Sequence, residues 1–439
     1  MMDHMDMAMP RLHPDMMARY EIEDHRPARI NAVQFGTGEA LLGTVDRLID
    51  DARAGIGIAC VEADASGHAR RLTAQRGLYT VVIRGYVGEE AVRREQVVQC
   101  VLSACGPEGL DALAHDQEIA LGIVDDTPEA RALAARFAES RRDLGLGDVP
   151  MLRLGEDMLA DSLAFRSEPD EARRECAEMN YLDDMLHLAE PYARLTIRAS
   201  DQLRAAFPLD RAGGVRFADE ADFRLAARLR AQVFDAGLFL MAAAGWLNGC
   251  DTLSDCMRHK RLRRFVGEGF TREIMPALQD IDRAILERAV IDSFARYENP
   301  LNRNRILRAA DHLIARFSRG IFPLMRALSE QNFEPPRRLS FALAATIMLY
   351  AGARRQPETG ACAVARGKQV ETLHDDPAAA IKRFFTLAHD MPPESLAYAA
   401  LADRELWHTD LRQVDGLEAR VALDIAAMQR EPGYLPTED

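Results

Sequence analysis

Short apolar runs alternate with helical periodicity over the first part of the chain. Four runs have the length and composition of strands: Ile30–Phe35, Gly55–Val61, Leu78–Ile83 and Ile119–Val124. Between 41 and 49, apolar residues recur at helical spacing, which predicts a helix with one buried face. Strands that alternate with helices predict βαβ units and a mostly parallel sheet.

From about Asp219 the pattern changes to that of longer helices. Apolar residues recur at helical spacing over 306–317, and Gly320 is expected to end that helix. The segment Leu339–Tyr350 is almost wholly apolar but too short to span a membrane, so it is expected at the centre of a helical domain. The stretch after Ala351 is expected to be a loop. The fold class is therefore α/β plus α.

These patterns divide the chain into three parts. We expect a disordered leader over 1–27, an α/β nucleotide-binding domain over 28–218 and an α-helical domain over 219–439. The leader is rich in methionine and lacks the apolar run of a secretory signal, and chain termini are commonly loose. Soft ligands select Cu(I), so a copper site is the alternative reading of His4, Met5, Met7, Met9 and His13.

The composition and net charge of the chain argue against some kinds of binding partner. The chain has 439 residues, with 55 Lys+Arg and 69 Asp+Glu, for a net charge of −14. An acidic protein of this kind is not expected to bind nucleic acid, and no apolar run is long enough for a membrane span. The seven cysteines form no Cys-x-x-Cys pair, which favours reduced thiols and the cytoplasm. The histidines lack metal-ligand spacing, so no metal is expected.

A glycine turn follows the first predicted strand. Phe35 is followed by Gly36-Thr-Gly38 at the start of a helix, where backbone N–H groups bind phosphates in dinucleotide sites. Glu62 ends the next strand and is expected to accept hydrogen bonds from ribose hydroxyls, with Asp64 as the other candidate. A carboxylate there favours NAD over NADP. The third glycine comes two residues later than in the usual fingerprint, so a turn that needs glycine only for its backbone angles is the alternative.

Several segments after residue 29 together carry a family resemblance. They are Gln34–Leu42, Gly77–Gly85, Ala189–Tyr192, Phe207–Gly213, Arg296–Pro300, Pro336–Ala345 and Leu411–Leu417. They resemble the mannitol dehydrogenase family of polyol-specific long-chain dehydrogenases, and most closely its tagaturonate reductase (altronate oxidoreductase) and fructuronate reductase branch. The resemblance implies a Rossmann-like N-terminal domain, a mostly α-helical C-terminal domain and NAD(P)-dependent alcohol–ketone interconversion on a sugar acid or polyol. It also implies that Phe35 and Asp126 contact the cofactor.

The catalytic motif of that family is altered in this chain. The family pattern is a lysine base, an asparagine five residues later and a histidine three residues beyond. Alignment through Gly245–Thr252 gives Arg230, Asp235 and Leu238 at these positions, and Arg224–Trp246 contains neither lysine nor histidine. Arginine stays protonated and cannot act as the base, so the family mechanism does not transfer directly.

Three readings follow from this divergence. In the first, which we favour, the chain is an oxidoreductase in which Asp235 or Glu190 is the base and Arg230 or Arg166 binds a substrate carboxylate. In the second it is a catalytically silent relative that binds a nucleotide or a protein partner, and in the third it has lost even the nucleotide. The alternative for Arg230 and Asp235 is a solvated surface pair without a catalytic role, since Arg–Asp pairs are common on exposed helix faces.

Overall fold

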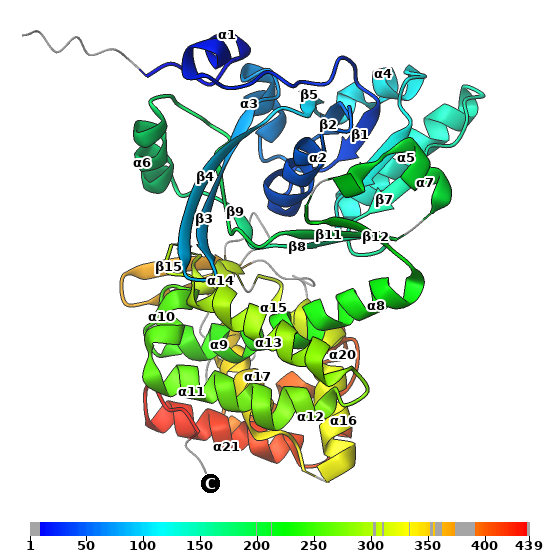
Figure 1. The fold of residues 1–439 in the computed structure, drawn as a ribbon. Helices are drawn as coiled ribbons and strands as arrows, with labels where there is room; N and C mark the ends of the chain where they lie inside the picture. The colour runs from blue at the N-terminus through cyan, green and yellow to red at the C-terminus, as the bar shows by residue number, and fades with distance from the viewer. Residues whose placement is uncertain are drawn as a thin grey trace, which may run out of the picture. The chain divides into compact units, whose positions relative to one another are not determined.

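The computed structural model describes residues 9–198, 200–211, 213–301, 304–309, 311–332, 334–351, 354–355, 362–373 and 391–436. The chain divides into two compact units, Met1–Ala226 and Ala227–Asp439 (Figure 1). The domain boundary expected at 218/219 lies shortly before this division, at the start of helix α8 (Glu220–Leu229). Within the described ranges, no helix is long and apolar enough to cross a membrane.

Unit 1 is built on a five-stranded parallel sheet with the strand order β5-β2-β1-β6-β7. Ala32 of the central strand packs into one apolar cluster, whereas Val33 and Phe35 pack into another on the opposite face. Burial on both faces explains why these strands are almost continuously apolar in sequence. The strands are β1 (Ala32–Phe35), β2 (Ile58–Val61), β5 (Val101–Cys105), β6 (Leu121–Val124) and β7 (Met151–Arg153).

Two smaller sheets complete the strands of unit 1, in the orders β4-β3-β10-β9 and β12-β11-β8. The predicted strand at Leu78–Ile83 belongs to the first of them, as part of an antiparallel hairpin with β4. All four predicted strands therefore exist, three of them in the parallel sheet. The strands are β3 (Tyr79–Val87), β4 (Glu90–Val98), β8 (Met158–Asp161), β9 (Ala164–Arg166), β10 (His187–Ala189), β11 (Arg194–Arg198) and β12 (Val215–Ala218).

Helices cover the parallel sheet. The helix predicted between 41 and 49 is present as a π-helical turn, Leu41–Val45, that continues directly into α2. On the other face, Phe137 of α5 packs on Phe35 with ring centroids 5.4 Å apart. Helix α6 (Pro169–Met179) packs instead against the β4-β3-β10-β9 sheet, and the other helices are α2 (Asp46–Ala52), α3 (His68–Ala74), α4 (Leu110–His115), α5 (Pro128–Asp143) and α7 (Asp201–Ala206).

The expected disordered leader differs from the structure over residues 9–27. Helix α1 (Pro14–Met17) lies in this segment, and Leu12, Met16 and Met17 are buried in an apolar cluster with Leu78 of unit 1. The methionines that looked like a soluble leader are thus partly core residues, because a flexible thioether side chain packs well in irregular apolar space. His4, Met5 and Met7 of the copper alternative lie outside the described residues.

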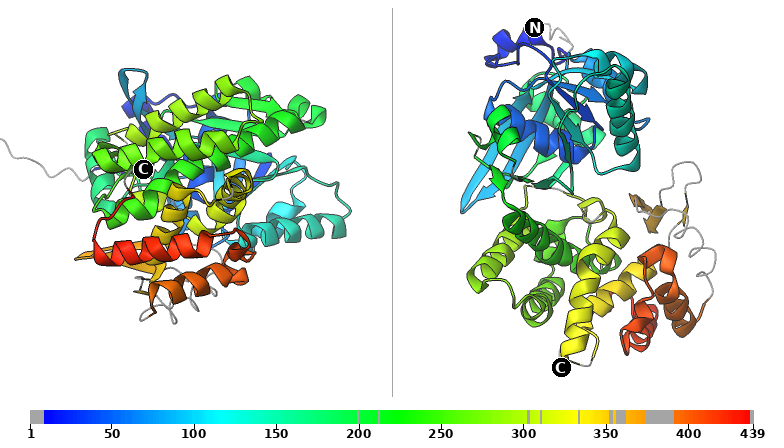
Figure 2. Two further views of the ribbon diagram at one scale, coloured as in Figure 1. Left: turned by 90° about the horizontal axis from the view of Figure 1, so that it is seen from below. Right: turned by 90° about the vertical axis from the view of Figure 1, so that its right-hand side faces the viewer.

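Unit 2 is mostly helical (Figure 2), and its two most buried helices, α9 and α17, pack against each other. Helix α17 contains the apolar segment predicted at Leu339–Tyr350, and it packs against both α9 and α21. The helices are α8, α9 (Asp235–Leu247), α10 (Leu253–Arg258), α11 (Lys260–Gly269), α12 (Met275–Ala277), α13 (Arg283–Glu298), α14 (Ile306–Ala309), α15 (Leu313–Arg316), α16 (Phe322–Asn332), α17 (Arg337–Ala351), α19 (Pro393–Ala402), α20 (Arg404–Trp407) and α21 (Leu417–Arg430).

Three local expectations in unit 2 are wrong. The single helix predicted over 306–317 is divided into α14 and α15, because His312 adopts a left-handed conformation with φ of +60°. Gly320 does not end a helix but lies inside a π-helical turn, Phe317–Ile321. In the described part of the loop expected after Ala351, an antiparallel sheet forms from β13 (Arg354–Arg355), β14 (Cys362–Arg366) and β15 (Gln369–Leu373).

Candidate functional sites

The glycine turn joins β1 to the first long helical segment of unit 1. Gly36 has φ of +107°, a backbone conformation that side chains rarely adopt. The N–H groups of Leu41 and Leu42 both donate to the carbonyl of Gly38 at 3.0 Å, so helical structure begins directly after the second glycine. β1 lies between β2 and β6, and ligands of α/β proteins bind at the carboxyl ends of strands at such a switch of strand order. This geometry suits a dinucleotide phosphate.

The side chain of Asp125 packs against this turn. Asp125 follows β6 directly, and its N–H donates to the carbonyl of Phe35 at 2.9 Å. A Cβ atom on Gly36 would lie 2.7 Å from the Cβ of Asp125, and a Cβ on Gly38 would overlap its Oδ2. Gly36 is required by its positive φ, whereas a side chain at position 38 would displace the Asp125 carboxylate. The sequence analysis missed Asp125, although its place after a strand next to β1 was a signal that could have revealed it.

The Asp125 carboxyl group also has an unusual titration behaviour. Desolvation raises its pKa to about 6, and the carboxylates of Asp126 and Asp64 act in the same direction. Hydrogen bonds from the N–H groups of Asp126, at 2.9 Å, and of Gly38 lower the pKa but do not outweigh burial. The carboxylate thus lies beside Gly38, in the part of the turn where a phosphate binds in dinucleotide sites.

Glu62 lies where the sequence placed it, immediately after β2. Its Oε1 accepts hydrogen bonds from Ser66 Oγ at 2.6 Å and from the N–H of His68 at 2.7 Å. These bonds tie Glu62 to the first residue of α3. Asp64, the other candidate, accepts from the N–H of Ser66 at 3.1 Å. Both carboxylates therefore organise the loop that precedes α3.

The other two proposed cofactor residues occupy different environments. The side chain of Phe35 is fully buried against Phe137, so only its backbone borders the glycine turn. Asp126 is exposed, and its carboxylate pairs with the guanidinium of Arg131 at 2.6 Å. Arg131 also pairs with Glu156 at 3.0 Å.

Arg166 is connected to the glycine turn through His68. An Arg166 guanidinium nitrogen lies 3.0 Å from His68 Nε2, and the other terminal nitrogen donates to the carbonyl of Asp184 at 2.6 Å. His68 Nδ1 lies 3.1 Å from the carbonyl of Thr37, between the two glycines. These partners require a neutral ring with its proton on Nδ1. Burial and the Arg166 charge lower the pKa of His68, in agreement with that form.

Glu190 is buried directly after β10. Its Oε1 accepts a hydrogen bond from the N–H of Leu163 at 2.6 Å, and its own N–H donates to the Leu163 carbonyl at 3.1 Å. The reciprocal bonds fix the chain before β9 against the end of β10. Glu190 therefore has a clear positional role in unit 1.

In unit 2, Arg230 and Asp235 meet on one face of their helix. Residues 230–234 form a π-helical turn, in which the N–H of Asp235 donates to the carbonyl of Arg230. Arg230 Nε lies 3.3 Å from Asp235 Oδ1, and each side chain is only 14% exposed. The pair is thus not a solvated surface pair. Leu238, at the third family position, is fully buried in the core.

Two further arginines join this pair. Arg316 donates to Asp235 Oδ1 at 2.5 Å. The guanidinium carbons of Arg230 and Arg296 lie 4.4 Å and 3.7 Å from the ring centroid of Phe234. Arg316 and Arg296 come from later segments of unit 2, so the sequence motif alone did not reveal them. The cluster brings three guanidinium groups together around one carboxylate and one aromatic ring.

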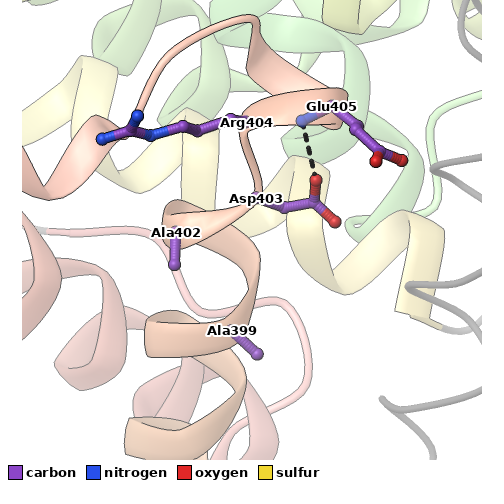
Figure 3. Close-up of a pocket in the computed structure, with 5 residues that line it drawn as sticks. All are labelled: Ala399, Ala402, Asp403, Arg404 and Glu405. Atoms are coloured by element: carbon purple, nitrogen blue, oxygen red, sulfur yellow. Dashed lines mark hydrogen bonds between the residues drawn. The ribbon is translucent and has the colours of Figure 1, made fainter.

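A hollow of about 390 Å³ lies elsewhere in unit 2, at the junction of α19 and α20 (Figure 3). Its lining includes Asp403, whose carboxylate accepts from the N–H of Glu405 at 2.9 Å and so caps α20. The side chains of Arg404 and Glu405 point away from each other (Figure 3). This lining serves a helix end, and we assign it no chemistry.

Comparison with solved structures shows which fold this is. Mannitol 2-dehydrogenase of Pseudomonas fluorescens, in a ternary complex with NAD and D-mannitol, matches with a TM-score of 0.79 and 13% identity, over 95% of this chain and 97% of that one. A D-sorbitol dehydrogenase in substrate-free form matches with a TM-score of 0.66 and 14% identity, over 97% of each chain. The predicted Rossmann-like domain followed by a helical domain is thereby confirmed.

Sequence comparison gives the same grouping. The altronate oxidoreductase of Klebsiella pneumoniae is 26% identical over 92% of this chain and 94% of that protein, and the Bacillus subtilis enzyme is 22% identical over 89% and 91%. The altronate oxidoreductase of Halalkalibacterium halodurans is 28% identical over 55% of this chain and 48% of that protein. Residues 233–429 match the mannitol dehydrogenase C-terminal domain. The chain is therefore similar to altronate oxidoreductases over most of its length, and its C-terminal part matches the mannitol dehydrogenase C-terminal domain.

Proposed function

We propose that this protein is a nicotinamide-dependent dehydrogenase that interconverts an alcohol and a ketone on a sugar acid or polyol of the altronate–tagaturonate type. The observation that carries the proposal is its similarity to altronate oxidoreductases over 92% of the chain. The catalytically silent alternative has no support in the comparisons. We propose a cytoplasmic location, because the six cysteines for which the structure describes the side chain are free thiols.

The cofactor proposal rests on unit 1. The Gly36–Gly38 turn at the end of β1 offers backbone N–H groups to a pyrophosphate, and Glu62 follows the neighbouring strand. A bound NADH would supply the hydride. We propose NAD rather than NADP, because the Glu62 carboxylate would repel a 2′-phosphate.

The substrate proposal rests on the arginine cluster of unit 2. Asp235 holds the guanidinium groups of Arg230 and Arg316, and guanidinium groups bind carboxylates with two parallel hydrogen bonds. We propose that Arg230 and Arg316 bind the carboxylate of a sugar acid and that Asp235 keeps them in position. Arg166 in unit 1 is a further candidate for contact with an anionic group, since it is half-buried beside the glycine turn.

Binding and turnover can be tested in sequence. Fluorescence titration with NADH and NADPH should show saturable binding, tighter for NADH. Turnover is then measured with tagaturonate, fructuronate and fructose as acceptors. No binding of either cofactor at millimolar concentration, at any pH between 5.5 and 8.5, would refute the dehydrogenase proposal.

The substrate class can be tested with one substitution and a matched control. Arg316→Gln should raise the KM for a uronate about tenfold or more, because one charge-assisted contact is lost, and change the KM for a neutral polyol less than twofold. Arg326→Gln, on an exposed face of α16, is the control and should change neither value. Equal effects of Arg316→Gln on both substrates would refute carboxylate recognition by this cluster.

A further inference from the structure

The phosphate-binding end of unit 1 already contains an anion. The Asp125 carboxylate lies against both glycines of the turn, with its Oδ2 in the space beside Gly38. We propose that this carboxylate competes with the pyrophosphate of a dinucleotide for the Gly36–Gly38 turn, so that cofactor binding requires Asp125 to move away or to take up a proton. The inference deepens the proposed nicotinamide dependence and rests on it.

The competition follows first from geometry. Oδ2 of Asp125 would overlap a single Cβ atom on Gly38, so the space that glycine leaves open at this position is filled by the carboxylate. A phosphate oxygen that accepts from the Gly38 N–H needs the same space. Asp125 is held there from two directions, by its N–H bond to Phe35 O and by the Asp126 N–H bond to its Oδ1, both 2.9 Å.

Electrostatics adds to the competition. The charged groups that face Asp125 are Asp64 from the loop after β2, Asp126 beside it and Asp46 from α2. Arg131 of α5, which contacts Asp126, is already paired with Asp126 and Glu156. A pyrophosphate would therefore enter a site of like charge, where two anions in contact repel strongly unless one is neutralised.

Protonation of Asp125 removes its negative charge, and this proton is taken up close to neutral pH. Burial and the surrounding carboxylates raise the pKa of Asp125 to about 6, and a bound pyrophosphate would raise it further. Protonated Asp125 can donate its hydrogen bond to a phosphate oxygen instead of repelling it. Binding of NADH above pH 6 should therefore be accompanied by uptake of up to one proton, and the affinity should fall as the pH rises.

The test compares the affinity for NADH in the wild-type protein and in Asp125→Asn at pH 6 and pH 8. Asn keeps the size of the side chain and one acceptor oxygen, which can take over the hydrogen bond from the Asp126 N–H. Asp125→Ser, which removes more of the side chain, is a second variant in case the amide orients unfavourably. Asp143→Asn makes the same charge change at the far end of α5, about 22 Å along the helix, and is the control.

Wild-type affinity should fall tenfold or more between pH 6 and pH 8, whereas affinity in Asp125→Asn or Asp125→Ser should change less than threefold. At pH 8 at least one of these variants should bind NADH at least tenfold more tightly than wild type, and Asp143→Asn should behave as wild type. Calorimetry in two buffers of different ionisation enthalpy should show proton uptake in wild type and none in Asp125→Asn.

Equal affinity and equal proton uptake in wild type and both Asp125 variants would overturn the role of Asp125 and leave the cofactor proposal intact. Binding only after Asp125 is replaced would support the inference in its strongest form. Absence of NADH binding in all proteins at both pH values would overturn the inference and refute the cofactor proposal as well.

Discussion

Asp235 is the residue that holds the arginine cluster of unit 2 together. Its Oδ1 accepts hydrogen bonds from Arg316 at 2.5 Å and contacts Arg230 Nε at 3.3 Å, so this oxygen is committed to holding two guanidinium groups. We expect Asp235→Asn to raise the KM for a uronate about tenfold and to lower kcat less than tenfold, because the arginines lose their shared anchor.

The same variant tests the earlier assignment of Asp235 as the general base. Loss of a general base lowers kcat by about 100-fold to 10,000-fold. A fall of this size with unchanged KM would show that Asp235 takes the substrate proton. Steady-state kinetics on a uronate that is turned over distinguishes the two roles.

Asp46 is a second buried carboxyl group, and its role is structural. It is fully buried, and its Oδ2 accepts hydrogen bonds from Tyr79 OH at 3.2 Å and Gln34 Nε2 at 3.3 Å. Burial raises its pKa to about 7, above the value near 4 of an unfolded chain. The folded state therefore binds this proton more tightly, and Asp46 lowers the free energy of unfolding as the pH rises from about 4 to about 7.

Asp46→Asn removes that titration. Its free energy of unfolding minus that of wild type should be about 2–4 kcal/mol larger at pH 8 than at pH 5, because only the wild type is destabilised as Asp46 ionises. Urea unfolding at the two pH values measures the difference, with Asp143→Asn as a charge-matched control. The same wild-type-to-variant difference at both pH values would contradict the assignment.

At the level of elements, the apolar pattern of the sequence predicted the main strands and helices but not the irregular turns between them. The four predicted strands and the helix at Leu339–Tyr350 are present in the structure. Each is a continuous run of mostly apolar residues, so its burial could be predicted from the sequence. The break at His312 depends on a single left-handed residue. The strands β14 and β15 carry mixed apolar and polar residues, so no periodicity marked them.

The candidate sites likewise contain some residues that the sequence revealed and others that it did not. The Gly36–Gly38 turn and the Arg230–Asp235 pair were evident from local sequence. In a regular α-helix, however, residues five apart point about 140° away from each other, and only the π-helical turn brings Arg230 and Asp235 together. Asp125 was missed although it directly follows a predicted strand, whereas His68 could not be recognised, because its contacts with Thr37 and Arg166 form only in the folded chain.

Gly320 gives a test of how closely the π-helical turns pack. Gly320 lies in the turn Phe317–Ile321, and a Cβ atom there would lie 2.6 Å from the carbonyl oxygen of Ala231, in the turn that begins with Arg230. Gly320→Ala should therefore push two backbone segments apart and lower the free energy of unfolding by about 2–3 kcal/mol.

Gly267→Ala is the matched control for this prediction. Gly267 lies within α11, and a Cβ atom there meets nothing within 4 Å. Its replacement should be neutral or stabilise by about 0.5–1 kcal/mol, as expected for alanine in a helix. Thermal unfolding of both variants measures the contrast, and equal melting temperatures would refute close packing at Gly320.

At the scale of the whole chain, the N-terminal segment is part of unit 1. Arg53 pairs with Glu23 through both terminal nitrogens, at 3.0 Å and 2.8 Å, and His25 Nε2 lies 3.0 Å from the buried carboxylate of Asp50. Leu12 and Met17 are fully or almost fully buried. The sequence suggested a disordered leader because its apolar residues follow neither helical nor strand spacing. Apolar side chains at irregular spacing can nevertheless be buried against the rest of the fold.

Truncation tests this attachment. Removing residues 1–27 should lower the free energy of unfolding of unit 1 by about 3–6 kcal/mol, since the buried side chains of Leu12, Met16 and Met17 each contribute about 1.5–3 kcal/mol before the ordering cost of the segment. Removing residues 1–8 alone is the control and should leave stability unchanged.

The effect of the longer truncation should also depend on pH. The hydrogen bond to Asp50 raises the pKa of His25, so the stabilisation that His25 contributes is present at pH 6 and is lost above that raised pKa. The penalty of the longer truncation should therefore be smaller at pH 9 than at pH 6, and equal stability of the two truncated chains would show that the segment is not anchored.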